Sequence, residues 1–123
     1  MGFKFTKRRD STMTKIKINV KEFSDDPFGR DDNDGPFNGD KFRREYLSKA
    51  FKEYDKVIVD FSGLQAFPGT SFIGSAFIGL MTRDGVPYEM IRSKLDVLPK
   101  DSVYPESINM ILELQKHLMI GRK

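Results

Sequence analysis

The chain has 123 residues, of which 38% are hydrophobic, with no cysteine and a formal net charge of +3. This length fits one domain with an apolar core of its own, and the lack of cysteine excludes a disulfide framework and a thiolate metal site. No apolar run approaches the roughly 20 residues of a membrane-spanning helix, so we expect a cytoplasmic protein that does not act on a membrane.

Charge is distributed unevenly along the first third of the chain. Residues 1–22 carry seven Lys or Arg and two acidic residues, whereas residues 24–40 carry six Asp and one Arg. Such blocks are typical of solvated tails and loops. We therefore expect residues 1–13 to form a flexible basic arm and residues 14–123 to form a single folded domain.

The first predicted element is a strand over residues 15–20, "KIKINV", in which Ile16, Ile18 and Val20 alternate with polar residues. Residues 23–39 follow and are crowded with Asp, Gly and Pro. Long loops in compact domains tend to be functional or disordered, so this segment is a candidate interaction loop.

A helix is predicted to begin near Asp40, with Asn38 or Asp40 as its N-cap. Its apolar residues recur at helical spacing: Phe42, Tyr46, Leu47, Ala50, Phe51 and Tyr54. Its other face is expected to be basic: Lys41, Arg43, Arg44, Lys49 and Lys52.

Residues 56–61, "KVIVDF", form a continuous apolar run that is typical of a buried central strand. A second helix follows the "PGTS" turn, and its buried stripe consists of Phe72, Ile73, Ala76, Phe77, Leu80 and Met81. Residues 83–87 predict a turn, and residues 88–99 contain a further strand. A last helix begins at Pro105, a favourable first-turn position, with an apolar side made of Ile108, Ile111, Leu112 and Leu118.

The alternation of strands and helices predicts an α/β fold. Its crossover connections imply a mixed, partly parallel sheet with about three to four helices packed on it.

Signals for catalysis are weak. His117 is the only histidine, and it lies late in the last helix, where the helix dipole favours a cation. The chain has no G-x-S-x-G nucleophile elbow, and it has neither a phosphate-binding loop with its lysine nor a dinucleotide fingerprint. We therefore expect no enzyme activity and no cofactor.

The acidic stretch "RDDNDG" does not match a calcium-binding loop. If Gly35 took the fixed glycine position, Arg30 and Lys41 would fall on ligand positions. We therefore predict no metal site, although a looser oxygen site formed by Asp31, Asp32 and Asp34 stays an alternative.

The hydroxyls of Thr70 and Ser71 lie where the "PGTS" turn becomes the second helix. A helix N-terminus has unpaired backbone N–H groups and a positive dipole end. One of the two residues therefore serves as the helix cap, or the pair forms a phosphorylation site, because a phosphate is tolerated there and adds negative charge at the surface.

The segment "VIVDFSGLQAFPGTSFIGSAFIGLM" resembles the STAS domains of anti-sigma factor antagonists. "GRDDNDGPFNGDKFRREYL" and "GTSFIGSAFIGLM" are more similar to the related STAS-like family of unknown function. The resemblance covers about residues 15–84, and it implies a STAS-like α/β fold and an interaction module rather than a catalyst. In STAS domains a partner kinase phosphorylates a serine at this helix start, which makes Ser71 the first candidate phosphoacceptor and Thr70 the second.

This chain departs from the family at two places. Gly74 and Ser75 stand where the family often has acidic residues, and Gly69-Thr70-Ser71 replaces the Asp-Ser-Ser pattern of STAS phosphoacceptors. Gly74, Ser75 and Gly79 together form a small-residue stripe, which serves either internal packing or the close approach of a partner.

We predict a phosphorylation-controlled, partner-switching protein whose partner is a kinase-like ATPase or a regulatory complex. We call residues 23–39 the acidic loop. The predicted contact residues lie in this loop and around the start of the second helix: Arg30, Phe37, Asn38, Pro68, Gly69, Gly74 and Ser75.

Two alternatives remain at this point. The first is a nucleic-acid-associated protein that contacts phosphates through Lys4, Lys7, Arg8 and Arg9. The second is a phage or mobile-element inhibitor of a host protein complex. The oligomeric state does not follow from the sequence.

Overall fold

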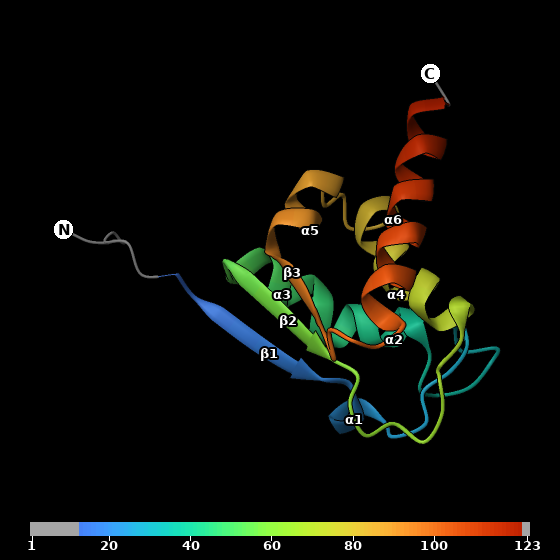
Figure 1. Cartoon of the computed structure of the whole chain (residues 1–123). Coiled ribbons are helices and arrows are strands. Elements are labelled where there is room, and N and C mark those ends of the chain that lie inside the picture. Colours follow the sequence, from blue (N-terminus) through green and yellow to red (C-terminus); the bar gives the residue numbers. More distant parts are fainter. Residues whose placement is uncertain (1–12, 122–123) are drawn as a thin grey trace.

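The computed structural model describes residues 13–121 of the chain (Figure 1). Its strands are β1 (Lys15–Asn19), β2 (Lys56–Asp60) and β3 (Leu95–Leu98). The predicted strands at residues 15–20 and 56–61 are confirmed to within one residue, and β3 is the strand that was expected within residues 88–99.

The helices connect the strands in the predicted alternation, which confirms the α/β class. Their bounds are α1 (Val20–Phe23), α2 (Gly39–Phe42), the π-helical turn η1 (Arg43–Leu47), α3 (Ser48–Glu53), α4 (Thr70–Thr82), α5 (Tyr88–Lys94) and α6 (Tyr104–Gly121). The segments α2, η1 and α3 follow one another without a break and correspond to the helix predicted from near Asp40. Sequence periodicity did not reveal α1 or α5, which are only four and seven residues long.

The sheet has the order β1-β2-β3, and all of its described strands run parallel. Both crossovers step in the same direction across the sheet, so right-handed connections place their helices on one face. The burial pattern agrees, because Val57 and Val59 are fully buried whereas Ile58, which points to the other face, is only half-buried. Lys17 and Asp60 form an ion pair of 3.4 Å on that other face. The described fold therefore has two layers.

A cluster of aromatic rings joins the helices that surround the start of α4. The ring of Phe42 in α2 lies 5.3 Å from that of Phe23 in α1 and 5.7 Å from that of Phe72 in α4. Phe37 in the acidic loop packs edge-on against Phe23 at 5.5 Å. Burial of several aromatic side chains supplies a large apolar contribution to stability, and here it also fixes the acidic loop beside α4.

The last helix, α6, extends beyond the rest of the fold at its C-terminal end (Figure 1). Ile108 and Leu112 are fully buried, as predicted, but Leu118 is 51% exposed, so its expected place in the core is wrong. The reason is geometric, because the last turns of α6 extend beyond the rest of the fold, so that Leu118 is only partly covered. Among the described residues, no helix is both long and apolar enough to cross a membrane.

Candidate protein-interaction site at the start of α4

Asn38 organises the end of the acidic loop. Its side-chain oxygen accepts a hydrogen bond from the backbone N–H of Lys41 at 2.8 Å, which caps α2 as predicted. Its side-chain amide donates to Asp32 at 2.9 Å and to the carbonyl of Gly35 at 2.8 Å. Asn38 is fully buried, so the prediction that it contacts a partner directly is wrong, and its role is to shape the loop.

The acidic loop lies against the first turns of α4. The hydroxyl of Ser75 donates to the backbone carbonyl of Arg30 at 2.8 Å. Gly39 packs so closely on the carbonyl of Phe72 that a Cβ atom there would collide with it. The structure therefore brings together two predicted contact segments, joined here by residues that lie 45 positions apart in the sequence.

The N-cap of α4 is Gly69, whose φ of +94° is a conformation that favours glycine. The N-cap lies one residue before Thr70 and two before Ser71, and no side chain caps the helix. The prediction that Thr70 or Ser71 serves as the cap is therefore wrong. Both residues occupy the first turn instead, both are exposed, and neither hydroxyl forms a hydrogen bond within residues 13–121.

Two shallow grooves meet at Thr70 and Ser71. One runs along the exposed side of α4 from Thr70 and Ser71 to Arg83, and Arg30 of the acidic loop also lines it. The second lies between the "PGTS" turn and the acidic loop, where Phe28 is 48% exposed. We call this combined area the helix-start surface, and it consists of Phe28, Arg30, Pro68, Gly69, Thr70, Ser71, Gly74 and Ser75.

The remaining predicted contact residues occupy distinct environments. Pro68 is buried and contributes mainly to the shape of the turn, whereas Phe37 is 42% exposed beside Lys41, whose ammonium lies 5.9 Å from the ring.

The small-residue stripe contains one glycine that faces open space and one that is covered by another side chain. Gly74 faces open space, where an added Cβ atom would meet only the end of Ile78, whereas Gly79 is covered by Arg43.

Sequence periodicity missed Arg43, which it placed on the exposed basic face of the first long helix. The side chain of Arg43 is in fact 6% exposed, and it lies between Asp40 at 2.7 Å and Asp84 at 2.8 Å. Burial alone would lower the pKa of Arg43, but its hydrogen bonds to Asp40 and Asp84 outweigh burial and raise that pKa. The hydrogen bond from Arg43 lowers the pKa of Asp40. The one sequence signal for this cluster is an Asp three residues before the Arg.

The three carboxylates of the alternative cation site do not converge. Asp31 accepts from the backbone of Asn33, Asp32 from the amide of Asn38, and Asp34 from the backbone N–H of Arg30. No group of metal-ligating side chains occurs within the described residues. Each carboxylate therefore has a role in holding the loop together.

The residues of the nucleic-acid hypothesis, Lys4, Lys7, Arg8 and Arg9, lie outside the described residues, as does nearly all of the predicted basic arm. These two predictions therefore stay predictions. His117 is exposed on α6, a different element from the one that carries Thr70 and Ser71.

Comparison with protein families gives a match that covers the centre of the chain. Residues 38–98 match the model of a family described as a STAS-like domain of unknown function. The matched segment begins at the cap of α2 and ends with β3, so it includes the Arg43 cluster, the "PGTS" turn and all of α4. The comparisons with curated proteins and with solved structures found no match.

Proposed function

We propose that this chain, whose residues 38–98 belong to the STAS-like domains of unknown function, is a non-enzymatic regulatory module that binds a protein partner through the helix-start surface. In this proposal, phosphorylation of Ser71 or Thr70 by a kinase-like ATPase controls which partner is bound. The observation that carries it is the pair of exposed hydroxyls in the first turn of α4, neither of which is engaged in capping the helix.

The helix start favours a phosphate on electrostatic grounds. The first backbone N–H groups of α4 have no partner within the helix, and the dipole is positive at this end. A phosphate brings about −1.5 to −2 charges and strong acceptor oxygens. It would therefore be compatible with the folded helix, and phosphorylation would not need to unfold the domain.

The same phosphate would change the surface that a partner meets. Arg30 lines the groove along α4 together with Ser71, and its carbonyl accepts a hydrogen bond from Ser75, about one helical turn after Ser71. Arg83 lines the same groove but lies at the far end of α4. Arginine pairs readily with phosphate oxygens, so the modification would occupy the Arg30 cation, which is otherwise open to an acidic group of a partner. Loss of one partner and gain of another follow from this change of charge.

A catalytic role for the hydroxyls has less support. A nucleophilic serine or threonine needs a base within hydrogen-bond reach. Within the described residues, neither Thr70 nor Ser71 is hydrogen-bonded to an imidazole or a carboxylate. We therefore treat these hydroxyls as acceptors of a group transferred by another protein.

The test begins with intact-mass spectrometry of the protein purified from its native host, together with identification of the proteins captured with it. We expect a mass shift of one phosphate that maps to Ser71 or Thr70. Binding of the captured partner to four variants then follows by calorimetry: Ser71→Asp, Ser71→Ala, Thr70→Asp and Ser93→Asp. Ser93 is an exposed serine of α5 and serves as the matched control.

We expect Ser71→Asp to weaken binding of the partner by about tenfold or more, which corresponds to roughly 1.4 kcal/mol. Ser71→Ala and Ser93→Asp should bind like the unmodified protein. Equal affinity of the Ser71→Asp and Ser71→Ala variants, with Thr70→Asp equally without effect, would contradict the switch and leave a constitutive adaptor.

A further inference from the structure

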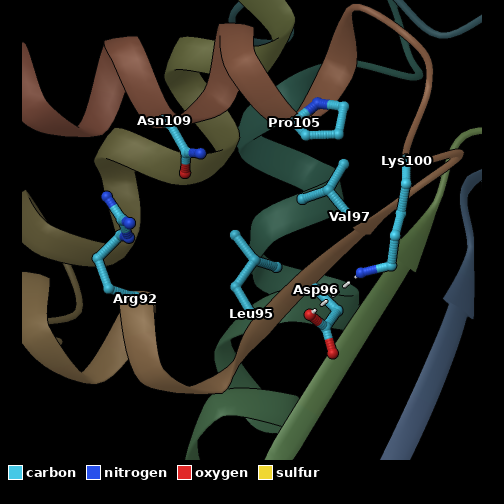
Figure 2. A pocket seen from close by; sticks show the side chains of 7 residues that line it. All are labelled: Arg92, Leu95, Asp96, Val97, Lys100, Pro105 and Asn109. Atoms are coloured by element: carbon cyan, nitrogen blue, oxygen red, sulfur yellow. Dashed lines mark ion pairs between the residues drawn. The ribbon is translucent and has the colours of Figure 1, made fainter.

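A groove opens beside β3, on the side of the strand that faces away from β2 (Figure 2). It has a volume of about 300 Å³ and lies between α5 and the first turns of α6. Arg92 of α5 borders it at one end, Lys100 borders it at the other, and Leu95 and Val97 of β3 lie between them (Figure 2). The helix-start surface contributes no residue to this groove.

The backbone of β3 presents unpaired groups to the groove. The N–H of Phe61, directly after β2, donates to the carbonyl of Leu98 at 2.9 Å, so the backbone groups of Leu98 face β2. Successive residues of a parallel strand direct their N–H and C=O groups to opposite edges. The N–H and C=O of Val97 therefore point away from the sheet, and within residues 13–121 no hydrogen bond to them is formed.

The carbonyl of Leu95 points the same way, while its N–H is bonded to the carbonyl of Ile91 at the end of α5. The open edge thus offers an acceptor, a donor and another acceptor in sequence, which is the pattern that an added strand pairs with. Val97 is only 9% exposed, and unpaired backbone groups close to a core carry a free-energy cost. A partner that supplied those hydrogen bonds would remove that cost.

The side chains define what kind of strand fits. Leu95, Val97 and Pro105 give the middle of the groove an apolar lining, and Asn109 adds a polar group above it. Arg92 donates one hydrogen bond, to the hydroxyl of Tyr88 at 3.0 Å, and its other guanidinium donors remain available. Lys100 lies 4.0 Å from Asp96, and the two side chains are 76% and 48% exposed, so this ion pair is weak.

We infer that an extended peptide segment with an apolar side chain between acidic residues adds to β3 as a further strand. Backbone hydrogen bonds to Leu95 and Val97 hold it in register, the apolar side chain enters the groove, and carboxylates meet Arg92 and Lys100. This inference does not depend on the helix-start surface or on phosphorylation of Ser71.

Charge distinguishes this occupant from the others that an open edge admits. The lining of the groove holds two cations, Arg92 and Lys100, and one acid, Asp96, so each copy carries net positive charge there and the β3 edges of two copies would repel each other. The chain's own residues 1–12 are basic and would meet the same repulsion. A foreign acidic strand is the occupant that the two cations favour.

The test uses the full chain as bait for a phage-displayed library of random linear peptides. We expect the enriched peptides to share an acid–apolar–acid pattern, and the synthetic form of the strongest binder to slow hydrogen exchange at the amide of Val97. Arg92→Glu and Lys100→Glu should each weaken this binder by about tenfold or more. Lys52→Glu, at an exposed lysine of α3, is the charge-matched control and should leave the affinity unchanged.

A peptide that is N-methylated at alternate backbone nitrogens keeps its charges but loses its donors, and it should also bind about tenfold more weakly. The inference is overturned if the library yields no binder, if the binders are basic, or if their affinity is indifferent to both charge reversals. It is also overturned if, without any peptide, hydrogen exchange at the amide of Val97 becomes slower as the protein concentration increases. The edge would then pair with a second copy of the chain.

Discussion

The guanidinium of Arg43 lies 2.8 Å from a carboxylate oxygen of Asp84, a residue 41 positions later in the chain. Asp84 also accepts from the hydroxyl of Ser48, and Arg43 donates to Asp40 at 2.7 Å. The cluster therefore ties α2 and η1 to the turn after α4. This tie fixes α2 and η1 against α4, whose other end carries Thr70 and Ser71.

Replacement of Arg43 by Ala should lower the free energy of unfolding by about 3 kcal/mol, because it leaves two partly buried carboxylates without their cation. Urea denaturation at neutral pH measures this change. Arg44→Ala is the matched control, since Arg44 pairs with the same Asp40 at 3.1 Å but is 50% exposed, and its loss should cost about 0.5 kcal/mol. Equal losses in the two variants would show that burial does not set the strength of the cluster.

Acid should weaken the fold through Asp40. The hydrogen bond with Arg43 lowers the pKa of Asp40 in the folded protein below 3.8, the ordinary value for Asp. The ionised Asp40 therefore contributes its full stabilisation at pH values above the ordinary pKa, and this contribution is lost as the pH falls through the lower pKa of the folded state. We therefore expect the free energy of unfolding to drop with decreasing pH below about 4. Urea denaturation at stepped pH values should give a shallower drop for Asp40→Asn. An unchanged drop would assign the acid sensitivity to Asp60, whose pKa is also lowered because hydrogen bonds from Ser62 and the charge of Lys17 outweigh its burial.

The regular elements were predictable because apolar periodicity reports them directly. The strand at residues 56–61 and the buried stripe of α4 needed no knowledge of the rest of the chain. The burial of Arg43 did not follow from periodicity, because it depends on Asp84, which arrives from a distant turn. The start of α4 differed by one residue because a glycine with positive φ is an alternative to a hydroxyl cap, and local propensity favoured the hydroxyls.

The groove beside β3 could not be inferred from the sequence for a related reason. Its lining comes from α5, β3 and α6, and α5 itself gave no clear periodic signal. The unpaired backbone groups of Val97 depend on which strand lies at the edge of the sheet, and strand order is a property of the assembled fold. The neighbourhood of Arg30 and Ser75 was expected only through the family resemblance, not from any local pattern.

Two leucines of α6 provide a test of where the core ends. Leu112 is fully buried, whereas Leu114, two residues later, is 63% exposed. Leu112→Ala should lower the free energy of unfolding by about 2–5 kcal/mol through lost burial and the cavity that remains. Leu114→Ala should change it by about 0.5 kcal/mol or less. Thermal unfolding followed by circular dichroism measures both, and a large loss in Leu114→Ala would mean that something covers this side of α6 in solution.

Two glycines of α4 should respond in opposite directions to the same substitution. A Cβ atom at Gly79 would lie 2.7 Å from both Cδ and Nε of Arg43, whereas one at Gly74 would meet only Ile78, at 3.8 Å. Gly79→Ala should therefore lower the free energy of unfolding by about 1–3 kcal/mol, because Arg43 must leave its place between two carboxylates. Gly74→Ala should raise it by about 0.5–1 kcal/mol, because alanine is the better helix former. Chemical denaturation of both single variants, and of the double variant Gly79→Ala with Arg43→Ala, tests this cause. The stability lost through Gly79→Ala should be smaller when Arg43 is already replaced. An equal loss in the presence and absence of Arg43 would mean that the added Cβ atom collides with another group.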